Sequence, residues 1–430
     1  DTAVQDNLLM SYGEAYEEGL RVKVLGCKTR VSTLMKPKPA TMSTITTFHA
    51  VLKGLPRAVF NRCVEQHHAD KYCKTFYAWD QLLAMVYAQL SSASSLRALE
   101  LGFNSHSMHH DRLQTCPIHR STLGDANRDR SSAVFEEIAA WLMSKVSRKL
   151  RHDAKELMCL LDSTSITLKG RDFDSWTLNN RNRNTQGIKL HALFDTASQA
   201  PLWHDFSAPN VNDVTQAKQV PLQRDTLYVF DKGYCDYNWW AQIDAAGARF
   251  VTRLKSNASL VSEMDFAIPS EAEGIVLRDE VVSFKNKYPG GKRVNQYGKP
   301  LRRVTIIRPG KSTPLILITN DFESSALEIG QYYKERWEIE LFFKWIKQHL
   351  KIKAFLGRTY NAVRIQVATA LIAYLLVALY KQTLRLEHTL WHCLGLIRAT
   401  LFEPPVIDLP VRTRPRRIQT LALGQLETLQ

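Results

Sequence analysis

The chain has 430 residues, which is room for two or three domains of the usual size. Its 45% hydrophobic and 23% charged residues are the proportions of an ordinary soluble globular protein. The formal net charge of +15 favours polyanionic partners, either nucleic acid or an anionic membrane surface.

Membrane insertion and export are both disfavoured. The longest apolar run, residues 367–380, is too short to span a bilayer and predicts a buried core helix. The N-terminal residues lack the basic start and apolar stretch of a signal peptide. Seven scattered cysteines without a C-x-x-C pair fit reduced thiols in the cytosol better than a disulfide framework. We therefore expect a cytoplasmic protein with no membrane partner.

A zinc site is an alternative use of some of these cysteines. Its ligands would come from the set Cys63, His67, His68, Cys73, Cys116 and His119. Their spacings match no standard zinc finger, and ordinary helix and loop residues are the simpler interpretation.

In chain order, residues 1–41 are predicted to be an extension, either weakly ordered or upstream read-through, because they show no sustained periodicity. Met35 and Met42 are both possible initiators. Residues 42–150 predict a helical domain. Its clearest helix has apolar residues at spacings of three and four, namely Trp79, Leu82, Leu83, Val86, Tyr87 and Leu90.

The segment Ser121–Arg130 predicts a further helix in this domain, opened by small polar residues that can cap it. It presents Asn127, Arg128 and Arg130, which would suit a DNA-binding module. A solvated helix face explains the same residues equally well.

Residues 156–256 predict the first part of an α/β core. We expect strands at residues 157–168, 189–194, 201–206, 226–230 and 249–254, with helices at 213–219 and 237–246. A β-rich insertion follows over residues 257–325, with strands at 274–284, 302–308 and 314–320. Residues 326–385 are predicted to be the second, helical part of the core, and residues 386–430 a C-terminal helix and basic tail.

Two aspartates stand just after apolar strand residues. Asp162 follows MCLL and Asp231 follows TLYVF. Side chains at the carboxyl ends of neighbouring strands meet at one edge of an open α/β sheet. Two carboxylates brought together repel unless a cation joins them, and oxygen ligands are those that Mg²⁺ prefers.

The strongest local pattern lies in residues 331–350. At about 100° per residue, five polar side chains fall within an arc of roughly 80° on one helix: Tyr333, Arg336, Glu340, Lys344 and Lys347. One carboxylate among several cations suits a metal ligand beside phosphate-binding groups. A solvated face with i, i+4 pairs is the alternative.

These residues resemble the DDE transposases of bacterial insertion sequences, in the large family (number four) that carries a Y-x2-R-x3-E-x6-K signature. Tyr333, Arg336, Glu340 and Lys347 match every spacing. The blocks Leu160–Thr164, Gly187–His191 and Asp231–Tyr234 are similar to further motifs of that family, in the same order. The resemblance covers about residues 42–380.

The resemblance implies a ribonuclease H-like core in which the third carboxylate arrives on a helix after the β-rich insertion. It implies Mg²⁺, with Mn²⁺ expected to substitute, held by Asp162, Asp231 and Glu340. The partners would be double-stranded DNA, as terminal inverted repeats and as target, with a homodimer on paired ends in the bacterial nucleoid. Predicted DNA-binding residues are Tyr333, Arg336, Lys344, Lys347, Lys189, His191, Asn127 and Arg128.

One departure concerns base stacking. Relatives can stack a flipped base on a tryptophan of the insertion, but residues 257–325 contain none. Tyr288 or Tyr297 would take that role, or the role is absent.

We therefore expect metal-dependent DNA cleavage at transposon ends and strand transfer into target DNA. The main alternative is a non-catalytic or domesticated DNA-binding relative. A small-molecule phosphoesterase fits the positive charge less well, and a purely structural α/β protein leaves the ordered motifs unexplained.

Overall fold

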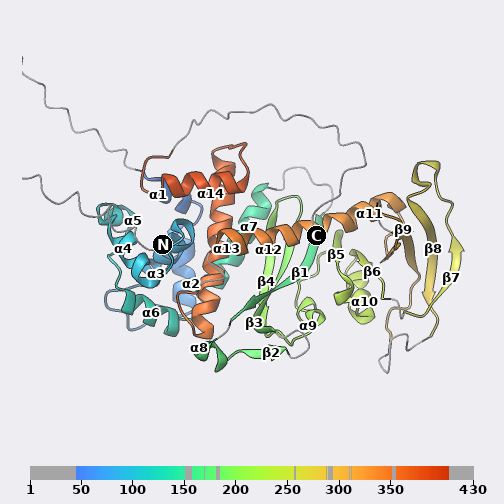
Figure 1. Ribbon diagram of the computed structural model, residues 1–430, viewed down its shortest axis with the longest axis horizontal. Helices are drawn as coiled ribbons and strands as arrows, with labels where there is room; N and C mark the ends of the chain where they lie inside the picture. The colour runs from blue at the N-terminus through green and yellow to red at the C-terminus, as the bar shows by residue number, and fades with distance from the viewer. Residues whose placement is uncertain are drawn as a thin grey trace, which may run out of the picture. The chain divides into compact units, whose positions relative to one another are not determined.

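The computed structural model describes residues 45–150, 157–168, 170–180, 185–255, 258–286, 288, 294–308, 310, 312–350 and 355–405. Among them, a group of helices precedes a large mixed sheet, and further helices follow it (Figure 1). The predicted extension over residues 1–41 and the predicted basic tail beyond residue 405 lie outside the described residues.

The first region is helical, as predicted. Its helices are α1 (Thr47–Leu52), α2 (Arg57–Gln66), α3 (Ala78–Ser91), α4 (Leu96–Asn104), α5 (His110–Leu113), α6 (Arg120–Asp129) and α7 (Ala133–Leu150). The sequence predicts one apolar face for α3, yet every residue from Ala78 to Leu90 is buried. The reason is that α4, α6 and two later helices, α13 and α14, all pack against α3.

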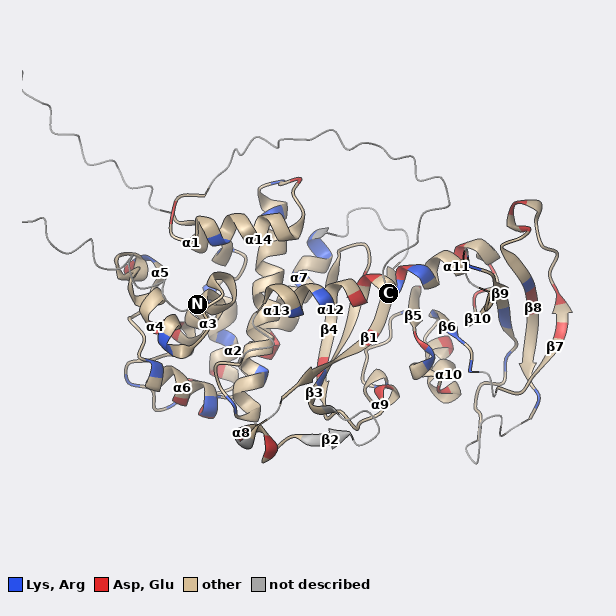
Figure 2. Ribbon diagram, in the orientation of Figure 1, with Lys and Arg blue, Asp and Glu red and all other residues tan. Residues whose placement is uncertain are grey.

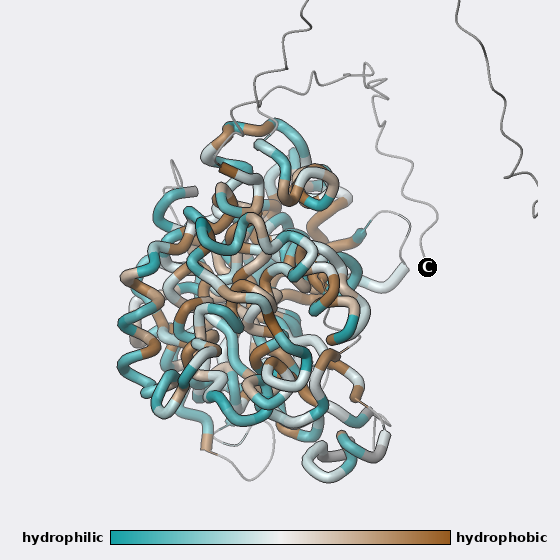
Figure 3. Tube along the Cα trace, turned by 90° about the vertical axis from the view of Figure 1, so that its left-hand side faces the viewer, coloured by the Kyte–Doolittle hydropathy of each residue, from teal (hydrophilic) through white to brown (hydrophobic). Residues whose placement is uncertain are grey.

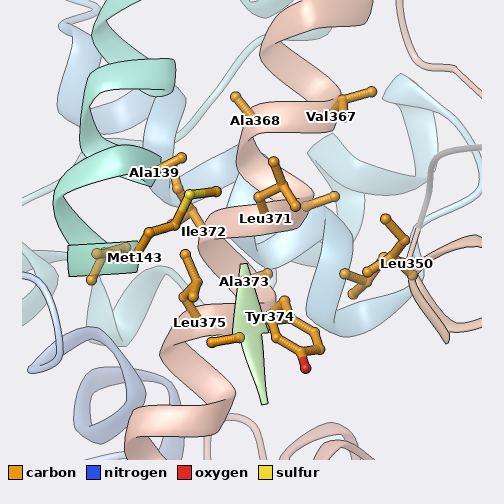
Figure 4. Packing of buried hydrophobic residues seen from close by; sticks show 14 of the residues in the cluster. Ala139, Met143, Leu350, Val367, Ala368, Leu371, Ile372, Ala373, Tyr374 and Leu375 are labelled. Atoms are coloured by element: carbon orange, nitrogen blue, oxygen red, sulfur yellow. The ribbon is translucent and has the colours of Figure 1, made fainter. Parts of the chain in front are cut away.

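The apolar run near the C-terminus forms the centre of the core. It lies in α13 (Tyr360–Thr383), which contacts α1, α3, α6, α7, α12 (Trp337–His349) and α14 (Leu390–Ala399). Figure 4 shows its Leu371, Ile372 and Leu375 beside Ala139 and Met143 of α7. By length and composition α13 could cross a membrane, but 94% of its most apolar window is buried inside the protein. The prediction of a buried core helix is confirmed.

Five strands make the ribonuclease H-like sheet: β1 (Leu157–Thr167), β3 (Thr185–Asp195), β4 (Ala200–Ser207), β5 (Thr226–Phe230) and β6 (Arg249–Arg253). Their order is β4-β3-β1-β5-β6. β3 runs antiparallel to both β4 and β1, whereas β5 and β6 run parallel to β1. All five were predicted. A short strand, β2 (Leu178–Asn180), follows the helical turn α8 (Arg171–Asp174) and pairs with the beginning of β3.

Helices cover both faces of this sheet. Leu160 and Leu190 belong to the core that includes α7, α12 and α13. Leu161 and Phe230 belong to a second core with Trp239 of α10 (Tyr237–Ala245), beside the short helix α9 (Asp213–Ala217). In Figure 3, hydrophilic residues line much of the periphery, and hydrophobic residues gather toward the middle of the trace.

The backbone structure explains why residue 187, in the motif between the two aspartates, is a glycine. It pairs with Thr167 across β1 and β3 and has a φ of +142°. A Cβ atom there would lie 2.1 Å from the carbonyl oxygen of Ile166. Only glycine permits this close approach of the two strands.

The segment predicted as β-rich continues the same sheet. Its strands are β7 (Leu260–Asp265), β8 (Val276–Phe284), β9 (Leu301–Ile306) and β10 (Leu315–Thr319). β10 pairs antiparallel with β6, and β9, β8 and β7 follow in order. β7 was not predicted, because this exposed edge strand, LVSEMD, shows no regular alternation of apolar and polar residues.

Candidate active site

The two aspartates lie side by side on neighbouring strands. Leu161 of β1 pairs in register with Phe230 of β5, so Asp162 and Asp231 follow at the same level of the sheet. β1 matches the strand predicted over residues 157–168 and continues to Thr167 through its pairing with β3, so Asp162 lies within the strand and not, as was also expected, at its carboxyl end. β5 does end at Phe230, and there Asp231 leaves the sheet.

Glu340 lies in α12 (Trp337–His349), which directly follows α11 (Ala326–Glu335). Ser325 and Glu328 form a capping box that fixes the start of α11. The single helix predicted over residues 331–350 is interrupted at Arg336, whose amide bonds Tyr333 O, three residues back. The break is slight because Arg336 keeps a right-handed helical conformation. Acidic and basic residues both occur along α11 and α12 (Figure 2).

Signature residues of α11 and α12 reach the aspartates directly. Arg336 donates from Nη1 to Asp162 Oδ2 at 3.3 Å and from Nη2 to Glu340 Oε1 at 2.6 Å. Tyr333 donates its hydroxyl to Asp231 Oδ1 at 3.1 Å. The predicted triad therefore gathers around one guanidinium and one phenol, although its members come from three distant segments.

The electrostatics of the site reflect this crowding. Burial, together with the nearby carboxylates of Glu340 and Asp231, raises the pKa of Asp162 to about 6 against the opposing effects of the Ser163 amide and Arg336. Burial and Asp231 raise the pKa of Tyr333 to about 12. Burial alone would lower the pKa of Arg336, but the combined effects of Glu340, Tyr333 and Asp162 outweigh burial and raise it.

The donor set suits a hard divalent cation. Three carboxylates supply oxygen ligands, and two of them, on Glu340 and Asp231, add a repulsion to the burial of Asp162 that a cation would relieve. Within the described part of the chain, no three His, Cys, Asp or Glu side chains are grouped closely enough to hold a metal ion between them. Arg336 stands between Asp162 and Glu340 and supplies the neutralising charge in this structure.

The predicted lysines lie along the same helix. Lys347 donates to the Ser165 carbonyl oxygen on β1 at 3.0 Å, and Lys344 is exposed. The sequence analysis missed Arg253, at the end of β6, whose Nη1 lies 3.9 Å from Asp231 Oδ1. The same strand-end argument that selects Asp231 would have found it, because β6 runs parallel to β5.

Lys189 and His191 are not available to DNA, contrary to prediction. They are 5% and 1% exposed. Successive side chains alternate between the faces of a strand. His191 pairs with Ser163 rather than Asp162, so it lies on the opposite face of the sheet from the carboxylates, and Lys189, two residues away, shares that face.

The prediction for α6 is also largely wrong. Asn127 is 1% exposed and accepts a hydrogen bond from Gln81. Arg130 is 9% exposed and donates to backbone carbonyls and to Gln81. Arg128 is exposed, but Asp125 and Asp129 neutralise its charge. The helix begins at Arg120, so Ser121 lies within its first turn and does not cap it.

The two tyrosines considered for base stacking differ. Tyr297 is 5% exposed and packs edge-on against Phe250, so burial excludes it from that role. Tyr288 is 52% exposed and stays a candidate.

Comparison with known proteins identifies the family of this chain. The family described as "Transposase DDE domain" matches residues 153–376, and a "Domain of unknown function (DUF4372)" matches residues 43–112. A protein of Sinorhizobium fredii named as transposase y4zB is 36% identical over 319 residues, covering 71% of this chain and 86% of its own. A protein of Geobacillus stearothermophilus named as a transposase for insertion sequence element IS5377 is 27% identical over 277 residues, covering 62% and 68%.

Among solved structures, the cryo-EM structure of a piggyBac transposase synaptic complex with hairpin DNA is similar, with a TM-score of 0.46 and 11% identity. The similarity covers 83% of this chain and 80% of that chain. The family match spans more than half of the chain and includes all three carboxylates. The chain belongs to the DDE transposases of bacterial insertion sequences, which bind DNA, cleave it and transfer its strands.

Proposed function

We propose that Asp162, Asp231 and Glu340 are the catalytic carboxylates of this transposase and hold Mg²⁺, with Mn²⁺ able to substitute. The observation that carries the proposal is the contact of Arg336 with both Asp162 and Glu340, beside the Tyr333–Asp231 hydrogen bond. Bound divalent ions activate the attacking oxygen and stabilise the leaving oxygen of a phosphodiester. The reactions are hydrolysis at a transposon end and attack of the released 3′ hydroxyl on target DNA.

The surrounding cations orient the DNA backbone. Lys344, Lys347 and Arg253 lie around the carboxylates, where they can bind phosphates on either side of the scissile bond. Tyr333 adds a hydroxyl donor beside Asp231. In the DNA-free protein Arg336 holds two carboxylates together. A bound phosphate would compete for its guanidinium and leave those carboxylates to the metal ions. Two protomers would pair two transposon ends.

The test is cleavage of a supercoiled plasmid that carries the inverted repeats flanking the reading frame. In Mg²⁺, Asp162→Asn and Glu340→Gln should each lower cleavage by about a thousandfold or more, since metal stabilisation of the transition state contributes several kcal/mol. Both variants should still bind end DNA. Asp225→Asn is the matched control, because Asp225 is exposed and its φ of +54° suits asparagine.

Retained cleavage in either triad variant would overturn the assignment of the site. A wild-type protein that binds the ends but leaves the plasmid intact would instead indicate a non-catalytic DNA-binding relative.

A further inference from the structure

A group of buried and half-buried polar side chains lies behind β1, on the sheet face opposite Asp162. We call it the Asp213 cluster, and its members are Ser163, Lys189, His191, Ser207 and Asp213. They come from β1, β3, β4 and the first turn of α9. Neither the carboxylate triad nor the DNA-binding residues account for this cluster.

Asp213 is the centre of the cluster. Its Oδ1 accepts from Ser163 Oγ and from Lys189 Nζ, both at 2.9 Å. Lys189 also donates to the carbonyl oxygen of Val211 at 2.7 Å, in the loop that leads into α9. A buried ammonium is tolerated only when it is paired and hydrogen-bonded. The ion pair therefore fixes Asp213 against the sheet.

His191 is neutral and lies between Ser207 and Asp213 of the cluster. Ser207 Oγ donates its single proton to the carbonyl oxygen of Ala208, so at 2.7 Å it accepts from His191 Nε2. The proton is thus on Nε2, and Nδ1 faces Asp213 Oδ1 at 3.9 Å.

Ser163 connects this cluster to the active site. Its hydroxyl donates to Asp213, and its backbone amide donates to Asp162 Oδ1 at 2.8 Å. One residue therefore has its side chain anchored on one face of the sheet while its amide contacts the carboxylate on the other. Outer contacts of this kind orient metal ligands.

We infer that Asp213 and Lys189 are positioning residues, which hold Ser163 so that its amide directs the Asp162 carboxylate into the active site. The inference rests on the proposed function, in which Asp162 is a metal ligand. It replaces the predicted DNA-binding role of Lys189 with an action through Asp213 and Ser163. A purely structural role would only hold α9 against the sheet.

The test is Mn²⁺ binding to the full-length, DNA-free protein by calorimetry. Ser163→Ala removes the link to Asp213 and leaves the Lys189–Asp213 pair intact. It should raise the Mn²⁺ dissociation constant by about tenfold or more, and Asp213→Asn should do the same. Hydrogen exchange of the amides at residues 162–164 should become faster in Ser163→Ala without metal.

Two variants serve as controls. Ser163→Thr keeps the hydroxyl and should bind Mn²⁺ like the wild type. Ser207→Ala breaks a hydrogen bond on the same face without touching Asp213, and should change Mn²⁺ affinity by less than about twofold.

Wild-type affinity in Ser163→Ala, or equal weakening in Ser207→Ala, would overturn the inference. A wild-type protein that binds no Mn²⁺ would instead overturn the proposed function itself.

Discussion

Helices α6 and α11–α12 both present polar side chains of the kinds that bind DNA, but they use them differently. Asn127 of α6 and Arg130, which directly follows this helix, turn inward and bond to Gln81 of α3. In α11–α12, Tyr333 and Arg336 reach carboxylates on two strands. The side chains at α6 stabilise the fold, whereas those of α11 and α12 lie in the candidate active site.

The difference comes from what each helix packs against. α6 contacts α3, α4 and α13, whose buried polar groups need partners. α11 and α12 lie over β5 and β1, where Asp231 and Asp162 lie at the same level of the sheet. Residue type alone therefore cannot separate a structural arginine from a functional one. The following predictions test that separation, from the largest expected effect to the smallest.

Arg130→Met should lower the free energy of unfolding by about 3–5 kcal/mol, because it leaves buried acceptors without a donor. Urea unfolding measures this change. Arg128→Met is the control, because Arg128 is exposed and its replacement should leave the free energy of unfolding nearly unchanged. If Arg130→Met kept normal stability but lost binding to end DNA, the region of α6 would contact DNA directly, as first predicted.

Acidification should destabilise the protein through His191. Burial lowers the pKa of His191 to about 4, below its ordinary value of 6.5, so the unfolded chain binds the proton more readily. Stability from this group is complete above pH 6.5 and is lost as the pH falls toward 4, by on the order of 3 kcal/mol. His191→Gln should flatten that dependence in urea unfolding series. An unchanged pH profile would show that His191 is not buried in its neutral form.

Arg336→Gln should slow cleavage by about 30-fold or more, equivalent to roughly 2 kcal/mol, because the guanidinium that would bind a phosphate beside the carboxylates is lost. Single-turnover cleavage of end DNA measures the effect. The unfolding midpoint should move far less than in Arg130→Met. If Arg336→Gln lost much stability but cleaved normally per folded molecule, Arg336 would be a residue that stabilises the fold, like Arg130.

Lys347→Ala should weaken end-DNA binding by about fivefold and make its salt dependence shallower by about one phosphate contact. Lys299→Ala is the control, since Lys299 pairs with Asp244 away from the triad. Binding titrations at several salt concentrations decide it, and an unchanged slope would remove Lys347 from the phosphate contacts.

The sequence predicts the five core strands and the meeting of Asp162 with Asp231 because apolar strands and parallel pairing are local patterns with a fixed geometric result. It could not show which face Lys189 and His191 occupy, since that depends on register with β1. The burial of Asn127 depends on α3 and α13, which are distant in sequence. Arg253 was within reach of the same strand-end rule.

The pairing of β10 with β6 has a practical consequence for dissecting the enzyme. Excising residues 257–325 would strip β6 of its neighbour and leave a row of unsatisfied amides and carbonyls next to the strand that bears Asp231. Such an exposed strand edge can pair with strands of other chains and promotes aggregation. A shortened transposase would therefore need that edge covered, by a retained β10 or by proline and charge, to remain monodisperse.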